Sequence, residues 1–239
     1  MLGTLLTAIA IVLGVFAARS WRRRGLSVSR GFGFISAPLA ALDFCAGALI
    51  SGVAMAGVYL VEWQMGATRL ESIAPDFVAF GGVLGLLLAA AALEELLFRS
   101  FLLNGLVILL GDRKWLAVTL SAIVFGAIHL SNPHATSIAA FGNALGGMMY
   151  CVAFLGARSF WLPLGLHFSW NFVQGPLLGF PVSGMHFASI AEQHTTGSLL
   201  LTGGAYGPEA GLVGMASRFV IIVLVLAYLA ARPRQRNEA

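Results

Sequence analysis

The sequence predicts an all-α protein, a polytopic bundle of about seven to eight transmembrane helices. Of its 239 residues, 59% are hydrophobic and only 10% are charged, whereas ordinary soluble domains carry about 25% charged residues. The apolar residues gather in long runs, and about 20 such residues let a helix cross a bilayer. No polar block is long enough to fold a water-soluble core. We therefore expect a single membrane-embedded domain over residues 1–239.

The first apolar run, residues 2–18, is followed by four arginines between Arg19 and Arg24. Cleaved signal peptides carry their positive charge before the apolar run, so this order favours a first anchor with its amino end outside. Further apolar runs lie at about residues 38–61, 77–110, 115–130, 135–157, 160–174 and 212–231. Together these runs predict about seven spans.

The run over residues 77–110 is long for one crossing. As a helix it would measure about 50 Å, against a hydrocarbon core of about 30 Å. It must tilt, project from the membrane or break into two pieces. Counted as one crossing, it places the polar segments 62–76 and 175–211 together on the outer side. The longer segment is rich in turn residues and suits either a loop over a cavity mouth or a solvated connector.

The basic residues support this orientation and exclude one class of partner. Most of the 14 lysines and arginines lie in short loops beside apolar runs, where they orient a membrane protein. The net charge of +4 therefore does not indicate binding to nucleic acid. The residues that the topology places in the cytoplasm are Arg19, Arg22, Arg23, Arg24, Arg30, Arg113, Lys114, Arg158, Arg232, Arg234 and Arg236.

Two glycine pairs at GxxxG spacing lie in apolar runs, Gly81/Gly85 and Gly142/Gly146. Small residues at this spacing let two membrane helices approach closely. Both pairs therefore predict close helix contacts.

Glu94, Glu95 and Arg99 lie inside an apolar run. Each charge near the bilayer centre costs about 2.5 to 3.5 kcal/mol on insertion scales, so such residues indicate a functional site. Glu95 and Arg99 are four residues apart with the acid first, the favourable order for a helical ion pair, and we assign them to structural support. Glu94 points about 100° away from Glu95. It is left to face the bundle interior as a base, an acid or a metal ligand.

Two further runs carry polar groups at the same spacing. His129 follows Phe125 by four residues, and Asn171 follows His167 by four. With Glu94 these groups suit hydrolysis, because the carboxylate can accept a proton from water, an imidazole can polarise or donate, and the amide can stabilise an oxyanion. The alternative is a zinc site, in which Glu94, His129 and His167 would be the ligands. A carboxylate that binds zinc cannot also be the free base, so we favour hydrolysis that requires no cofactor.

Three motifs carry a resemblance to a known family: EExxxR at Glu94, FxxxH at Phe125 and HxxxN at His167. In this order and in apolar context they resemble the CPBP intramembrane proteases, which include the CAAX prenyl endopeptidase and the bacterial Abi proteins. The resemblance covers about residues 90–172. It implies that Glu94 activates the attacking water with His129, while His167 and Asn171 form the oxyanion site.

The resemblance also implies a partner and a location. The expected activity is that of an endopeptidase which cuts a membrane-associated or lipid-anchored peptide or protein within the lipid bilayer. The expected location is the bacterial inner (cell) membrane. Whether the enzyme uses a metal is left open by the resemblance.

Two other classes of function fit the charges inside the membrane. A proton-coupled small transporter or channel could use Glu94, Arg99 and the histidines as a relay. Transporters often consist of two related halves with paired broken helices, and the sequence shows no such repeat. In a non-catalytic immunity or scaffold protein, the same groups would only hold the bundle together.

Overall fold

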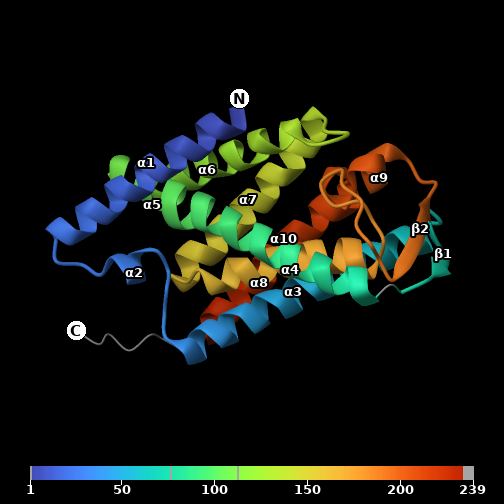
Figure 1. The fold of residues 1–239 in the computed structure, drawn as a ribbon, viewed down its shortest axis with the longest axis horizontal. Helices are drawn as coiled ribbons and strands as arrows, with labels where there is room; N and C mark the ends of the chain where they lie inside the picture. Colours follow the sequence, from blue (N-terminus) through green and yellow to red (C-terminus); the bar gives the residue numbers. More distant parts are fainter. Residues whose placement is uncertain (1, 76, 112, 234–239) are drawn as a thin grey trace.

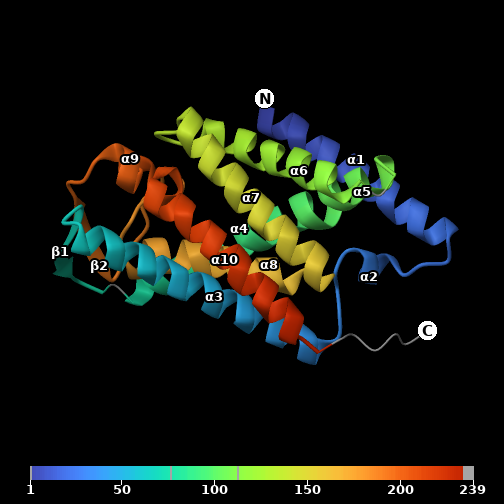
Figure 2. The ribbon, with the colours of Figure 1, turned by 180° about the vertical axis from the view of Figure 1, so that it is seen from behind.

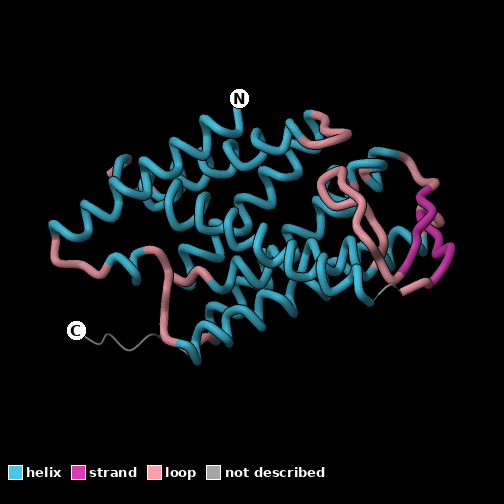
Figure 3. Tube along the Cα trace, in the orientation of Figure 1, coloured by secondary structure: helices cyan, strands magenta, loops and turns pink. Residues whose placement is uncertain are grey.

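The computed structural model describes residues 2–75, 77–111 and 113–233, and these form an all-α bundle with a small two-stranded sheet at one end (Figures 1 and 3). Six helical segments of the described chain are long and apolar enough to cross a membrane. This confirms the polytopic helical fold. The segments are α1 (Leu2–Arg23), α3 (Ala37–Gln64), α4 (Phe77–Glu95) with its continuation, α6 (Lys114–Ile128), α7 (Ser137–Ala157) and α10 (Leu212–Ala231).

The expected run over residues 160–174 also forms a helix, α8 (Trp161–Phe172), which continues as a π-helical segment, η3 (Val173–Leu177). The 12 residues of α8 span only about 18 Å, less than a bilayer core. Eight of them are buried. A Cβ at Gly165 would clash with the backbone carbonyl of Phe44 on α3, so the two helices touch through their backbones. The helix is thus the centre of the bundle and lies between α3, α4 and α7.

The long run after residue 76 stays one helical segment. It passes from α4 through a π-helical stretch, η1 (Leu96–Leu103), into α5 (Asn104–Leu109). A π-helical stretch is rare and frequently marks a functional site. Here it begins directly after Glu95 and contains Arg99, so the charged residues lie where the helix changes its hydrogen-bond register.

Two polar segments meet at one end of the bundle, as the topology predicts. Strand β1 (Thr68–Ile73) pairs antiparallel with β2 (Ala191–Thr195), at the right-hand end of Figure 1. The end of α1, the short α2 (Val28–Gly31), the start of α6 and the end of α10 lie toward the opposite end and carry arginines (Figures 1 and 2). Arg234 and Arg236 lie outside the described residues.

The last helix is fixed to the bundle along its length. Seen from behind, α10 crosses α3 and α7 (Figure 2). At its end Arg232 forms two hydrogen bonds to the buried carboxylate of Asp43 on α3, from Nε at 2.6 Å and Nη2 at 2.7 Å. Tyr228 donates a third at 2.7 Å. A bidentate, charge-assisted contact of this kind is geometrically specific, so it defines where α10 docks.

Only one of the two glycine pairs makes the close contact that its spacing predicts. A Cβ at Gly142 would clash with the carbonyl oxygen of Glu209, and one at Gly146 would lie 3.3 Å from the Cζ of Arg218. A Cβ at Gly81 or Gly85 would meet no described atom within 4 Å. The prediction is therefore wrong for Gly81 and Gly85. The Gly142/Gly146 pair makes room for a loop and for an arginine rather than for a bare helix.

Candidate active site

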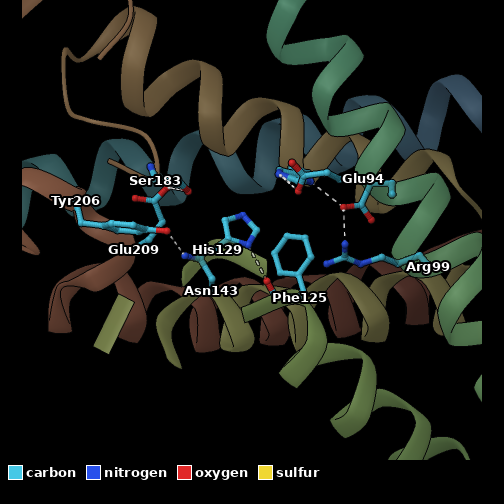
Figure 4. A network of polar contacts seen from close by, with 10 residues as sticks. Glu94, Arg99, Phe125, His129, Asn143, Ser183, Tyr206 and Glu209 are labelled. Atoms are coloured by element: carbon cyan, nitrogen blue, oxygen red, sulfur yellow. Dashed lines mark hydrogen bonds and ion pairs between the residues drawn. The ribbon is translucent and has the colours of Figure 1, made fainter. Parts of the chain in front are cut away.

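The four predicted catalytic residues line one cavity of about 470 Å³ among the helices. Glu94 comes from α4, and His129 follows the end of α6. His167 and Asn171 lie one turn apart on α8. Residues that are distant in the sequence thus converge on a common space, part of which Figure 4 shows.

Glu94 is the carboxylate that faces this space without a partner. Its side chain is 34% exposed, and its Oε2 lies 4.0 Å from Nε2 of His167. The same Oε2 is buried and accepts no hydrogen bond. An ionised carboxylate is purely an acceptor, and the exposed part of this side chain, rather than the buried Oε2, is open to a water molecule in the cavity.

Glu95 is fully buried and contacts two groups at once. Its Oε1 lies 3.1 Å from Nη1 of Arg99 and 2.8 Å from Nδ1 of His167. The ion pair with Arg99 is the one that the i, i+4 spacing predicts. The contact with His167 was not predicted from the sequence. Because the carboxylate only accepts, Nδ1 of His167 donates and Nε2 is directed toward Glu94.

Arg99 is held between aromatic rings as well as by Glu95. Its Cζ lies 4.2 Å from the ring centre of Phe125 and 4.8 Å from that of Tyr150. Desolvated cation–π contacts of this kind contribute about 2 kcal/mol or more each. The phenylalanine of the FxxxH motif therefore supports the arginine of the EExxxR motif, which explains why both residue types occur together.

His129 is oriented by its own helix. Its Nδ1 lies 2.6 Å from the backbone oxygen of Phe125, and since a carbonyl only accepts, Nδ1 is the donor. Nε2 is then free to accept a hydrogen bond. The Phe125 ring lies 4.7 Å from the ring of His129 and 6.0 Å from that of His167. One aromatic side chain thus contacts both imidazoles.

Tyr150 is a site residue that the sequence did not indicate. Its ring stacks on His167 with centres 4.8 Å apart and an angle of 19° between the planes. A tyrosine within an apolar run is indistinguishable from a packing residue. Its contact with His167 depends on how α7 and α8 cross, which no local pattern reports.

A second polar cluster occupies the far end of the cavity. Glu209 accepts hydrogen bonds from Nε2 of Gln174 at 2.7 Å and from the backbone nitrogen of Ser183 at 3.2 Å. Burial raises the pKa of the Glu209 carboxyl, whereas Arg218 and the hydrogen bonds oppose that rise. Figure 4 shows this cluster on the other side of His129 from Glu94.

The loop after α8 lines the cavity, which agrees with the first of the two interpretations of its turn-rich composition. Val182, Ser183, Met185, Phe187 and Glu209 all line the space. The loop is anchored through Nδ2 of Asn143 on α7, which donates to the hydroxyl oxygen of Tyr206 at 2.7 Å. Sequence reasoning did not assign these residues to the site, because the loop carries no periodic pattern.

The groups expected for zinc do not form a metal-binding cluster. Among the described residues, no three or more His, Cys, Asp or Glu side chains are placed to hold a metal ion. Of the predicted ligands, His129 and His167 each use Nδ1 within the protein, and Nε2 of His167 is 4.0 Å from Glu94.

The chain was compared with known proteins. The family model for type II CAAX prenyl endopeptidase Rce1-like proteins matches residues 76–173, which include all three motifs. No curated protein and no solved structure matches the chain. The family match confirms the resemblance that the motifs carry, and with the six apolar spans it indicates an integral membrane protease. Over residues 76–173 this chain is thus similar to the Rce1-like CAAX proteases.

Proposed function

We propose that this protein is an endopeptidase that hydrolyses a peptide bond of a membrane-associated or lipid-anchored peptide or protein, with water activated by Glu94. The observation that carries the proposal is the partly exposed carboxylate of Glu94, whose Oε2 accepts no hydrogen bond, within a cavity that His129, His167 and Asn171 also line. An apolar bundle that keeps an acceptor of this kind beside two imidazoles suits proton abstraction. The proposed location is the bacterial inner membrane.

The reaction needs one water molecule and no other reagent. The carboxylate of Glu94 takes a proton from the water, helped by a hydrogen bond from the water to Nε2 of His129. The water oxygen attacks the carbonyl carbon, and the carbonyl oxygen becomes an oxyanion. When the carbon–nitrogen bond breaks, protonated Glu94 returns its proton to the leaving amine.

Hydrogen-bond donors stabilise the oxyanion in this scheme. His167 and Asn171 project from one face of α8 into the cavity. For His167 to donate from Nε2 as well as from Nδ1, its ring must carry a positive charge. The buried carboxylate of Glu95, 2.8 Å from Nδ1, compensates that charge. Fixed donors in a site without bulk water lower the barrier strongly.

The substrate can be sought in cells. We expect membrane proteins with new termini in cells that produce the wild-type chain, and none in cells that produce Glu94→Gln. The control is Glu71→Gln, the same change at a half-exposed carboxylate on β1, which should behave like the wild type. Identical termini in all three samples, as read by mass spectrometry, would contradict the proposal. Glutamate-dependent solute flux in liposomes would favour the transporter instead.

Removal of metal is expected to leave the activity unchanged. The chain is purified, its metal content is measured, and hydrolysis is assayed before and after treatment with a chelator. The reason for the expectation is that Glu94 cannot serve as a zinc ligand and as the free base at once. Stoichiometric zinc whose removal stops hydrolysis, and whose return restores it, would overturn the metal-free mechanism.

A further inference from the structure

Arg218 is a buried cation that the proposed reaction does not use. It lies on α10 inside a membrane span, it is only 3% exposed, and it lines the same cavity as Glu94. Its Nε and Nη1 are buried and form no hydrogen bond within the described chain. Burying a charge without a hydrogen-bonded partner is costly, and an intramembrane cation indicates a functional group.

The nearest acid does not satisfy this guanidinium. Glu209 interacts electrostatically with Arg218, but the structure describes no ion pair within 4.0 Å between them. Both oxygens of Glu209 already accept hydrogen bonds, from Gln174 and Ser183. Arg218 also contacts the ring of Trp170, whose centre lies 5.0 Å from Cζ of the arginine. Glu209 therefore balances the charge of Arg218 from a distance. The N–H groups at Nε and Nη1 of Arg218 remain available to another acceptor.

Helix α7 gives the position of Arg218 relative to the catalytic centre. Three of its residues, each four apart, face the cavity region in turn. Gly142 contacts Glu209, Gly146 makes room for the guanidinium of Arg218, and Tyr150 stacks on His167. Four residues advance a helix by about 6 Å. The guanidinium thus lies about one turn from the imidazole, between the reacting groups and Glu209.

We propose that Arg218 binds a carboxylate group of the substrate peptide and selects substrates that carry one close to the cleaved bond. This inference rests on the proposed function. A guanidinium offers a planar pair of N–H groups that fits a carboxylate in bidentate fashion. The carboxylate comes either from the free carboxy terminus of the peptide or from an acidic side chain. Arg218 lies outside the segment that matches the family, so it belongs to the part of the chain that is free to define specificity.

The test uses a library of short N-acylated peptides that lack acidic residues, in liposomes that contain the full chain. Three versions of the library are made. The first has a free carboxy terminus, the second has a carboxamide terminus, and the third has a carboxamide terminus and one added aspartate. We expect the wild-type kcat/KM to be about 10- to 100-fold higher for a carboxylate than for the uncharged carboxamide, the effect of one charge-assisted hydrogen bond. The third library distinguishes a terminal carboxylate from a side-chain carboxylate.

The variant Arg218→Gln should remove this preference through KM, while Arg69→Gln, the same change at an exposed arginine on β1, should keep it. If Arg218→Gln lowers hydrolysis of every library equally, or keeps the preference, the residue is structural and the inference is wrong.

Should the variant not fold, the comparison of libraries with the wild-type chain decides alone. Equal hydrolysis of all libraries by the wild type overturns the inference and leaves the proposed function intact. No hydrolysis of any library overturns both.

Discussion

Replacing Glu94 by glutamine is expected to lower kcat for peptide hydrolysis by about 10²- to 10⁴-fold, the range that a positioned general base contributes. The amide has nearly the same shape but cannot take a proton from water. KM should change little, because the proposed base acts on the water and not on substrate binding. The measurement is hydrolysis of a lipid-anchored peptide by the purified chain in liposomes.

The stability of the Glu94→Gln variant should stay close to that of the wild type. Oε2 of Glu94 has no hydrogen-bond partner to lose, and the side chain is one-third exposed to the cavity. Glu71→Gln, on strand β1 of the two-stranded sheet, serves as the matched control and should keep its kcat. A Glu94→Gln variant that folds and retains wild-type kcat would refute the assignment of Glu94 as base.

Replacing Arg99 by methionine is expected to lower the free energy of unfolding by about 3 to 5 kcal/mol, the cost of removing one member of a buried ion pair. Glu95 would then be a fully buried carboxylate without its cation. The rings of Phe125 and Tyr150 would also lose the guanidinium that they cover. Unfolding in mixed detergent micelles measures the change.

The double variant Glu95→Gln/Arg99→Met provides the control for this prediction. It leaves no unpaired charge, so it should be more stable than Arg99→Met alone. Its hydrolysis should nevertheless be impaired, because His167 would lose the carboxylate that orients its Nδ1. Equal stability of Arg99→Met and the wild type would show that the pair does not support the site.

Much of the architecture could be predicted because the bilayer imposes a length and a composition on each span. The limits of this reasoning appear at α8 and at η1. The 160–174 run is as apolar as its neighbours, but only the packing of α8 against α3 and α7 shows that it is a short central helix. A change from α-helical to π-helical hydrogen bonding leaves no trace in the residue pattern of this run, so η1 could not be predicted.

The polar residues of the site could be found where a charge or an imidazole stood out against apolar surroundings. That contrast identifies Glu94, His129 and His167, and the structure brings them to one cavity. The same contrast applies to Arg218, which the sequence alone does not connect with the site. Its relation to the site became visible only through Gly146 and Trp170, which come from two other helices.

The π-helical stretch also restricts which changes of chain length the protein tolerates. Gly14 and Leu13 of α1 pack directly on Phe101 and Gly105, immediately beyond the charged residues. Losing one residue from this stretch would rotate everything after it by about 100°. Phe101 and Gly105 would then turn away from α1, although Glu94 and Glu95 would stay in place. We infer that the number of residues between Glu95 and Asn104 must stay constant.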